Sequence, residues 1–244
     1  MSNELKENIV NEDLTKKLFF YGNNHDEIKE KYVVSNGKTL DLVLVDFSKV
    51  DIDAIIDIVL DEKSICYVKI ASICFNSLKK KYNINVYHKG KESFSRVSTA
   101  GINLGDGSLI FLGNSYIANG ASKSDTRQEG KITNLSKDAH SEVSPALFIK
   151  ENDVKASHGA ALGAYNPDIL YYLMSRGLSL DDAKKIITFG TLNPIINSLE
   201  NKELVDKAKN ILEGLELWLM LKRLEMISQC IEIVVYIMVK QCIT

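Results

Sequence analysis

The feature that most constrains the fold is a series of short apolar segments that begins at Ser64 and continues through the middle of the chain. Clusters of glycine, asparagine, aspartate and serine separate most of these segments, so each one fits a short strand that ends in a turn. The segments read SICYVKI, INVYH, SLIFLG, SYIANG and KITNLS. Many short strands at roughly even spacing predict a β-sandwich, a β-barrel or a β-solenoid, and no exact repeat selects the solenoid.

The first part of the chain, residues 1–32, shows a different pattern, which predicts helices. Apolar side chains recur at near-helical spacing among charged ones. The stretch Gly22-Asn-Asn24 then breaks the run before a second short helix that ends near Tyr32. The recurring apolar residues are Leu5, Ile9, Leu14 and Leu18.

The hydrophobic period changes after this segment. An Asn36-Gly37 turn between two apolar runs predicts a hairpin-like unit that reaches Phe47. Residues 51–60 are ambiguous, but their apolar side chains fit a helix face better than a strand. Those side chains belong to Ile52, Ile55, Ile56, Val59 and Leu60.

Charge and composition narrow the function classes. The 244 residues suffice for one large domain or two small ones, and 30 basic residues nearly balance 32 acidic ones, leaving a formal charge of −2. This balance gives no electrostatic basis for binding nucleic acid or an anionic membrane. The opening sequence MSNELKENIVNEDL is acidic and lacks an apolar core, so we expect neither a signal peptide nor a transit peptide. Four cysteines without a CxxC pair predict a reducing, cytoplasmic location.

The sharpest local signals lie in residues 144–190. The run Pro145–Ile149 predicts a strand, and the imperfectly alternating run after it carries His158 at its centre. Asn166 is a good N-cap for a short helix, which Gly177 can end by adopting a positive φ.

A second helix begins at Ser179, which forms a capping box with Asp182 three residues later. We expect this helix to end near Gly190 and a further helical segment to run to about Glu216. The remaining residues, 217–244, are strongly apolar, but the charges among them argue against a membrane span. The pattern assigns no function to this tail.

In their order and spacing, these residues resemble the C-terminal signature of the SufB/SufD family, the scaffold proteins of the Suf iron–sulfur cluster assembly system. The match extends from Pro145 to Gly190, and the likeness upstream, from Val33 to Ser144, is general. The matching positions are Pro145, Leu147, Ile149, Asp153, Val154, Ser157, His158, Gly159, Ala160, Leu170, Tyr172, Leu173, Ser175, Arg176, Gly177, Ala183 and Gly190.

The resemblance implies a mainly β fold built on a right-handed parallel β-helix. We therefore expect four parts in the chain. They are an N-terminal helical segment over residues 1–32, the β-helix core over 33–163, a C-terminal helical region over 164–216 and the apolar tail over 217–244.

Within the family, the chain resembles the SufD-type branch more than the SufB-type branch. SufB-type members tend to carry an acidic residue directly after the signature histidine, where this chain has Gly159. They also supply a core cysteine that receives sulfur, because a thiolate is the nucleophile that this chemistry needs. This chain has no cysteine between Cys74 and Cys230. Cys66 and Cys74 lie in apolar runs, so we expect both to be buried thiols that act as small hydrophobic side chains.

His158 is the first candidate for cluster chemistry. Taken alone, it is a histidine on a strand whose ring nitrogens the backbone could satisfy, because one histidine cannot hold a metal without partners. The resemblance instead implies a role in cluster assembly at the interface with a SufB subunit. A neutral imidazole is a reasonable iron ligand there, and the small residues around His158 would leave it accessible.

Two weaker candidates lie upstream of His158. His140 and His158 would stack on successive turns if one solenoid turn had the length of the stretch that separates them in sequence. Glu142 is similarly placed, but a solvated carboxylate is the ordinary state of such a residue.

The resemblance also implies partners. The β-helix would pair with a SufB-type subunit or with a second copy, and an iron–sulfur cluster would bind transiently at that interface. The C-terminal helices would dock a SufC-type ATPase. Candidate contacts are Tyr165, Tyr171, Arg176 and Gly177, while Leu170, Leu173 and Met174 should pack inward.

The same resemblance implies that the chain is not an enzyme by itself and that it binds no nucleotide, which belongs to the ATPase. The glycine-rich run Gly101–Gly107 lacks the GK[ST] ending of a phosphate-binding loop, so turns between strands explain it better.

Two functions of other classes stay open. The helix pair within residues 167–189 matches the outline of a helix-turn-helix DNA reader, but its second helix would bring Asp181 and Asp182 to the phosphates. A β-solenoid lyase or acyltransferase would need clustered catalytic residues on one face or a strict short repeat. Neither pattern is visible in the sequence.

Overall fold

The computed structural model describes residues 5–214, and the chain divides into two units, residues 1–199 and residues 200–244. The described part of the second unit holds a helix over residues 202–214. The named elements of the first unit are β1 (Lys6–Val10), β2 (Leu14–Gly22), β3 (Lys29–Val34), β4 (Thr39–Ser48), β5 (Ile52–Leu60), β6 (Ile65–Cys74), β7 (Lys79–His88), β8 (Phe94–Asn103), β9 (Ser108–Ile117), β10 (Asp125–Asn134), β11 (His140–Ile149), β12 (Lys155–Gly163), α1 (Pro167–Ser175) and α2 (Leu180–Asn197).

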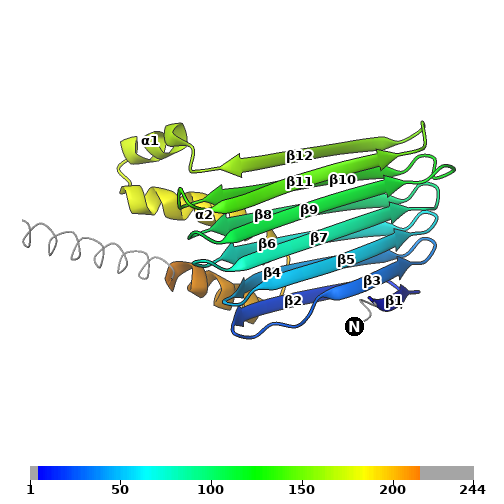
Figure 1. Ribbon diagram of the computed structural model, residues 1–244, viewed down its shortest axis with the longest axis horizontal. Coiled ribbons are helices and arrows are strands. Elements are labelled where there is room, and N and C mark those ends of the chain that lie inside the picture. The colour runs from blue at the N-terminus through cyan, green and yellow to red at the C-terminus, as the bar shows by residue number, and fades with distance from the viewer. Residues whose placement is uncertain (1–4, 215–244) are drawn as a thin grey trace, which may run out of the picture. The chain divides into compact units, whose positions relative to one another are not determined.

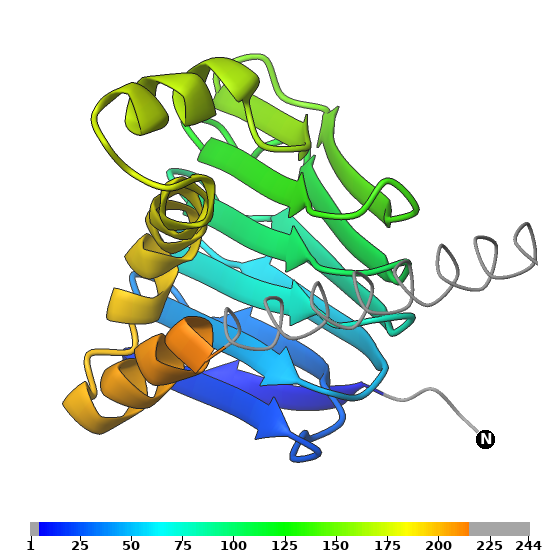
Figure 2. The same cartoon turned by 90° about the vertical axis from the view of Figure 1, so that its left-hand side faces the viewer.

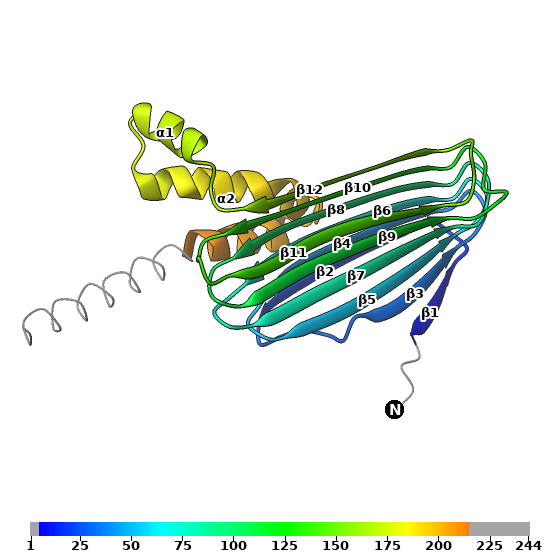
Figure 3. The same ribbon diagram turned by 45° about the horizontal axis from the view of Figure 1, so that its top comes forward.

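The strands form two six-stranded parallel sheets that face each other (Figures 1 and 3). The odd-numbered strands make one sheet and the even-numbered strands make the other. Each strand pairs with the strand two places along the chain, so that Lys6 meets Glu30 at one end of a sheet and Ser108 meets His140 at the other. This topology confirms the predicted parallel β-helix among the three open fold classes.

Alternate side chains of each strand point into the space between the two sheets and form the core. In the first turns this interior is apolar, and burying one such side chain stabilises the fold by about 1.5–3 kcal/mol. Its members include Leu40, Leu42 and Leu44 of β4, Ile56 and Ile58 of β5, and Val68 and Ile70 of β6. In the later turns the interior becomes polar, with buried Ser95, Thr99, Ser115, Thr126 and Gln128.

Helix α2 covers part of the even-strand sheet. The C-terminal halves of β4, β6 and β8 are buried on both faces, and α2 contacts these three strands (Figure 2). The helix does not end at Gly190 as predicted, but runs through Pro194 to Asn197. Burial of Leu192 and Ile196 offsets the cost of about 1 kcal/mol for glycine and about 3 kcal/mol for proline in a helix. Among residues 5–214, no helix is both long and apolar enough to span a bilayer.

The corners that lead from odd to even strands repeat one design. A residue with positive φ precedes a buried serine, whose hydroxyl lies within hydrogen-bond distance of the carbonyl three residues earlier. These hydroxyl distances are Ser64 to Asp61 at 2.8 Å, Ser93 to Gly90 at 3.0 Å and Ser124 to Ala121 at 2.8 Å. The positive-φ residues are Lys63, Glu92 and Lys123. This repeat marks one turn of the solenoid, and the pattern of apolar segments did not reveal it.

The predicted hairpin-like unit is wrong. Asn36 and Gly37 lie at the corresponding earlier corner, with Gly37 at a φ of +66°. The strands on either side, β3 and β4, therefore enter different sheets and do not pair with each other.

The prediction of helices in residues 1–32 is also wrong for the described residues, which form β1, β2 and the start of β3. The spacing of Leu14 and Leu18 fits a period of two as well, because both face the interior together with Lys16 and Phe20. Pairing of β2 with β4, in the next turn of the solenoid, selects the strand, and no local pattern reports such a pairing.

Residues 52–60 likewise form a strand, β5, instead of the favoured helix. Its inward residues follow a strict period of two, and all are buried. They are Ile52, Ala54, Ile56, Ile58 and Leu60. The additional apolar residues that mimicked a helix face, Ile55 and Val59, lie on the outer face of the sheet.

Candidate functional site

The last turn of the β-helix, made of β11 and β12, lies at the end of both sheets (Figure 1). Among the described strands, β11 pairs only with β9 and β12 only with β10, so each leaves one edge of backbone donors and acceptors unpaired. Most of β12 is exposed to solvent. Such an edge is a ready template for pairing with another chain.

His158 lies on the inner face of this last turn. Its register partner on β10 is Gln128, whose side chain points into the interior and is 2% exposed. Register partners in a parallel sheet share a face, so His158 points inward as well. His158 is nevertheless exposed, because β12 ends the sheet and no further strand of the described chain covers this rung.

Small residues surround His158. The inner-face positions on either side of it are Ala156 and Ala160, and a Cβ atom added at the adjacent Gly159 would meet no other atom within 4 Å. The imidazole is thus accessible from the open end of the solenoid, which is the arrangement that a ligand shared with a second molecule requires.

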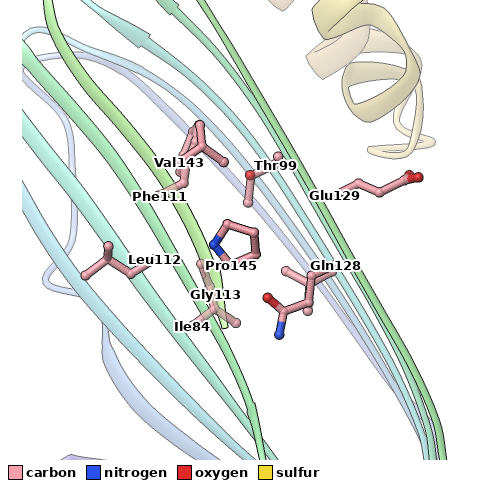
Figure 4. A pocket seen from close by; sticks show the side chains of 11 residues that line it. Ile84, Thr99, Phe111, Leu112, Gly113, Gln128, Glu129, Val143 and Pro145 are labelled. Carbon is pink, nitrogen blue, oxygen red and sulfur yellow. The ribbon is translucent and has the colours of Figure 1, made fainter. Parts of the chain in front are cut away.

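A cavity of about 20 Å³, large enough for one water molecule, lies in the interior next to the last turn (Figure 4). Glycines keep this space open: a Cβ atom at Gly130 would lie 2.4 Å from Cγ1 of Val143. Pro145 of β11 and the inward-facing Thr99 and Gln128 also line the cavity.

The structure does not bring the weaker candidates to His158. His140 and Glu142 lie on β11, in the opposite sheet, and they alternate with the partly buried Ser141 and Val143, so they face outward. The proposed stacking of His140 and His158 on successive turns is therefore wrong. One full turn leads from Gln128 to its register partner His158, and His140 lies partway along it.

The helical candidates have different environments. Tyr171 is 77% exposed, and Arg176 is exposed with its guanidinium carbon 5.3 Å from the centre of the Tyr172 ring. Tyr165 is partly buried instead, because its hydroxyl bonds Thr188 of α2 at 2.7 Å. Gly177 has a φ of +92°, which confirms that it ends α1.

Helix α1 buries none of its side chains. Leu170 and Leu173 are partly covered, as expected, but Met174 is 45% exposed and does not pack inward as predicted. The exposed apolar surface of α1 therefore includes Ile169, Tyr171, Tyr172 and Met174.

The cysteines of the described chain are buried thiols, as predicted. Burial raises the pKa of the Cys66 thiol well above its usual range and that of Cys74 to about 11, so neither forms a thiolate near neutral pH. Cys230 and Cys242 lie outside the described residues. In residues 5–214 no three histidine, cysteine or carboxylate side chains gather as a metal site. The run Gly101–Gly107 forms the end of β8 and the turn before β9, as predicted.

Sequence reasoning missed one buried titratable residue, His88, at the end of β7. Its ring bonds two serine hydroxyls, Ser93 at 2.8 Å and Ser95 at 2.9 Å. Burial lowers the pKa of His88 to about 4, so its imidazole is neutral at pH 7. The available signal was the alternation of β7, in which His88 takes the same inward face as Tyr82, Ile84 and Val86.

The chain is similar to known proteins over this region. The family model described as "SUF system FeS cluster assembly, SufBD core domain" matches residues 28–191, which is more than half of the chain. The matched range contains β3 to β12, α1 and most of α2.

Individual relatives match shorter stretches. The iron–sulfur cluster assembly protein SufD of Bacillus subtilis is 37% identical over 120 residues, which is 49% of this chain and 28% of that protein. SufD of Escherichia coli is 31% identical over 98 residues, 40% of this chain and 23% of that protein. The chloroplastic protein ABCI7 of Arabidopsis thaliana is 31% identical over 109 residues, 45% of this chain and 23% of that protein. Each match thus spans about a quarter of the relative's length.

Proposed function

Because the chain belongs to the SufBD family of iron–sulfur cluster assembly proteins, we propose that it acts as a SufD-like subunit of a cytoplasmic Suf assembly scaffold and is not itself an enzyme. The cluster is cargo that forms at an interface between subunits and then leaves. His158 supplies a ligand or a proton-accepting nitrogen at that interface.

The observation that carries this proposal is an exposed imidazole on the inner face of an unpaired end of the β-helix. One imidazole fills one position of an iron's coordination sphere, so the remaining ligands must come from elsewhere. The neighbours of His158 within β12, from Ala156 to Ala160, are small and uncharged, and both Cys66 and Cys74 are buried. A second subunit that docks on the last turn would bring the missing thiolate.

That second subunit is a SufB-type chain or another copy of this one. The unpaired edges of β11 and β12 offer main-chain hydrogen bonds, and inward Leu162, which is 51% exposed, offers apolar contact. Docking there would cover His158 and exclude water from the cluster site.

The exposed face of α1 would hold a SufC-type ATPase, which binds the nucleotide. Tyr171 and Tyr172 are large aromatic side chains left 77% and 56% exposed, and aromatic residues are frequent anchors of protein interfaces. Arg176 beside Tyr172 adds a charged contact.

Co-expression with SufB-type and SufC-type proteins tests the proposal. The chain should co-purify with both, and the complex should contain iron and acid-labile sulfide. His158→Ala should abolish most of this content while the complex still assembles. His140→Ala is the matched control, because it removes the other histidine of the last turn from its outer face and should leave the content unchanged.

Full cluster content in the His158→Ala complex would contradict the site. Failure of the wild-type chain to bind either partner would contradict the scaffold function as a whole.

A further inference from the structure

A continuous chain of hydrogen bonds crosses the interior of the later turns. It runs from Nε2 of His88 to Ser95 at 2.9 Å, from Ser95 to Thr126 at 2.8 Å, from Thr126 to Ser115 at 3.0 Å, and from Ser115 to the Gln128 amide at 2.6 Å. All five side chains are at most 2% exposed. The chain thus joins β7, β8, β9 and β10 without contact with solvent.

The amide of Gln128 fixes the direction of these bonds. One orientation of the amide satisfies both of its ends: the nitrogen donates to the carbonyl of Gly113 at 2.8 Å, and the oxygen accepts from the backbone N–H of Ser115 at 3.0 Å. In this orientation the Ser115 hydroxyl also donates to the amide oxygen. A hydroxyl has one proton, so Ser115 must accept its other bond.

The same rule of one proton per hydroxyl gives the direction of the next hydrogen bonds. Thr126 donates to Ser115 and accepts from Ser95, so Ser95 accepts from Nε2 of His88. His88 is therefore the neutral tautomer with its proton on Nε2. Nδ1 then accepts the Ser93 proton at 2.8 Å, in place of the Gly90 carbonyl at 3.0 Å. His88 and Gln128 thus stand at the two ends of one directed chain, in which each hydroxyl accepts one bond and donates the next, so a change of direction at one end must be matched at the other.

Packing alone does not hold Gln128 in this orientation. Its side chain borders the cavity of about 20 Å³, where Gly113 and Gly130 leave space beside it (Figure 4). The backbone bonds to Gly113 and Ser115 select its orientation together with the bond from the Ser115 hydroxyl.

Gln128 lies directly beneath His158 in the even-strand sheet. Neighbouring strands are about 4.8 Å apart, and both side chains point inward, so Gln128 is the side chain next to His158 on the inner face of the even-strand sheet. We propose that His88 is a positioning residue for the open end: through Ser95, Thr126 and Ser115 it sets the orientation of Gln128 and thereby that of the His158 ring. The functional meaning of this link rests on the proposed role of His158.

Nuclear magnetic resonance of the full chain, labelled with ¹⁵N, tests the link. Ser95→Ala breaks the chain one step after His88, and it should shift the side-chain amide signals of Gln128 and the ring nitrogen signals of His158. Ser95→Thr keeps the hydroxyl and should restore both. Ser72→Ala is the matched control, because Ser72 is equally buried and its hydroxyl bonds Tyr82 at 2.9 Å, outside this chain.

Shifts at Gln128 and His158 in Ser95→Ala but not in Ser72→Ala would support the proposal. Shifts in both variants or in neither would overturn it, as would a shift at Gln128 that leaves His158 unchanged. The wild-type signals of His88 must also show the proton on Nε2.

A second variant perturbs the other end of the chain if Ser95→Ala does not fold. In Gly113→Ala the new Cβ atom would lie 2.6 Å from the end of the Gln128 side chain, which can yield without moving the backbone. It should shift the His158 signals, whereas Gly159→Ala, which meets no atom, should leave Gln128 unchanged. Unmoved His158 signals in Gly113→Ala would overturn the proposal. None of these measurements needs a cluster or a partner, so their failure is distinct from a loss of cluster content in the complex.

Discussion

The two ends of the β-helix differ in the side chains that face the interior. At the first turn, Lys6 of β1 and Lys16 of β2 face inward, because their register partners Glu30 and Leu42 do. At the last turn, the inner face of β12 carries Ala156, His158, Ala160 and Leu162, and so no lysine, arginine or carboxylate. Lysines that point inward on an edge strand oppose pairing with another chain, because pairing would bury their charge. The inner face of β12 carries no lysine that would oppose pairing in this way.

The charge at the first end is held in place by a local network. Nζ of Lys16 bonds the Glu30 carboxylate at 2.6 Å and the Tyr32 hydroxyl at 3.1 Å, and that hydroxyl also donates to Glu30. These bonds satisfy the polar groups of Lys16, Glu30 and Tyr32 without a partner. β1 and β2 each leave one edge unpaired as well, so we call the first end closed only in the sense that its inner face carries charge. At the open end, by contrast, the exposed inner face of β12 carries the apolar Ala160 and Leu162 beside the imidazole of His158.

This asymmetry favours one kind of association. If both ends could pair, copies would stack head to tail and form open filaments. With only the last turn available, the expected product is a closed pair in which two last turns meet. The following predictions test this difference, from the largest effect to the smallest.

A lysine placed on the inner face of the last turn should convert the open end into a closed one. Ala160→Lys would bury an unpaired charge on docking, which costs about 3–5 kcal/mol, and a hundredfold or greater loss of partner affinity should follow. Ala160 is exposed in the single chain, so stability should change little. Sedimentation or calorimetric titration with the partner measures the effect.

Ala161→Lys is the matched control for this change, because Ala161 is also exposed but belongs to the outer face of β12. It should bind the partner almost normally. Equal losses in both variants would show that charge on β12 in general, and not on its inner face, opposes docking.

Acid should loosen the later turns before the first ones. Burial lowers the pKa of His88 from 6.5 to about 4, so between these values the unfolded chain binds a proton that the folded chain does not. The free energy of unfolding therefore falls as the pH drops from 6.5 toward 4, by about 3 kcal/mol at the lower limit. Hydrogen exchange should show β8 to β10 losing protection before β4 to β6.

His88→Gln is the control for the acid effect. It retains hydrogen-bonding groups but does not titrate in this range, so the part of the pH dependence due to His88 should disappear. A wild-type pH profile retained in this variant would assign the effect to carboxylates instead.

Removing the charge network of the first end should have a smaller effect. Burial raises the pKa of Glu30, but hydrogen bonds from Lys16 and Tyr32 outweigh it and hold the pKa below its usual range. Lys16→Ala should cost about 1 kcal/mol at pH 7, and this difference should fade as the pH falls and Glu30 becomes protonated. Lys29→Ala, at a pair whose Glu27 is 73% exposed, is the control and should change stability little. Denaturant titration at pH 7, and at a pH low enough to protonate Glu30, measures the free energy of unfolding of both variants.

The sequence could predict the features that depend on residues close together in the chain, but not those that depend on distant ones. Local signals succeeded: Asn166 accepts a hydrogen bond from the Asp168 N–H at 2.9 Å as an N-cap should, and Gly177 has the positive φ that ends α1. Cys66 and Cys74 are buried as their apolar neighbours indicated. Each of these features is set by residues within a few positions.

Features set by pairing between turns were missed. The strand at Leu14–Gly22 depends on β4, and the separation of His140 from His158 depends on the length of a whole turn. The polar interior was hidden for the same reason, because Ser95, Thr126 and Gln128 reveal their common face only once the register is known. The family resemblance predicted the β-helix, but it did not give the number of residues in each turn or the register of the strands.

The smallest effect on stability is expected at the exposed tyrosines, and it compares the two ends directly. Tyr171 of α1, which follows the last turn, is 77% exposed, and Tyr21 of the first turn is 43% exposed. Tyr171→Ala should change stability by about 0.5 kcal/mol or less, because little apolar area is lost. It should nevertheless weaken binding of a SufC-type ATPase about fivefold or more, since truncating an aromatic anchor of an interface costs over about 1 kcal/mol. Tyr21→Ala should leave that binding unchanged. Normal ATPase binding by a folded Tyr171→Ala chain, or an equal loss in Tyr21→Ala, would remove α1 as the docking surface.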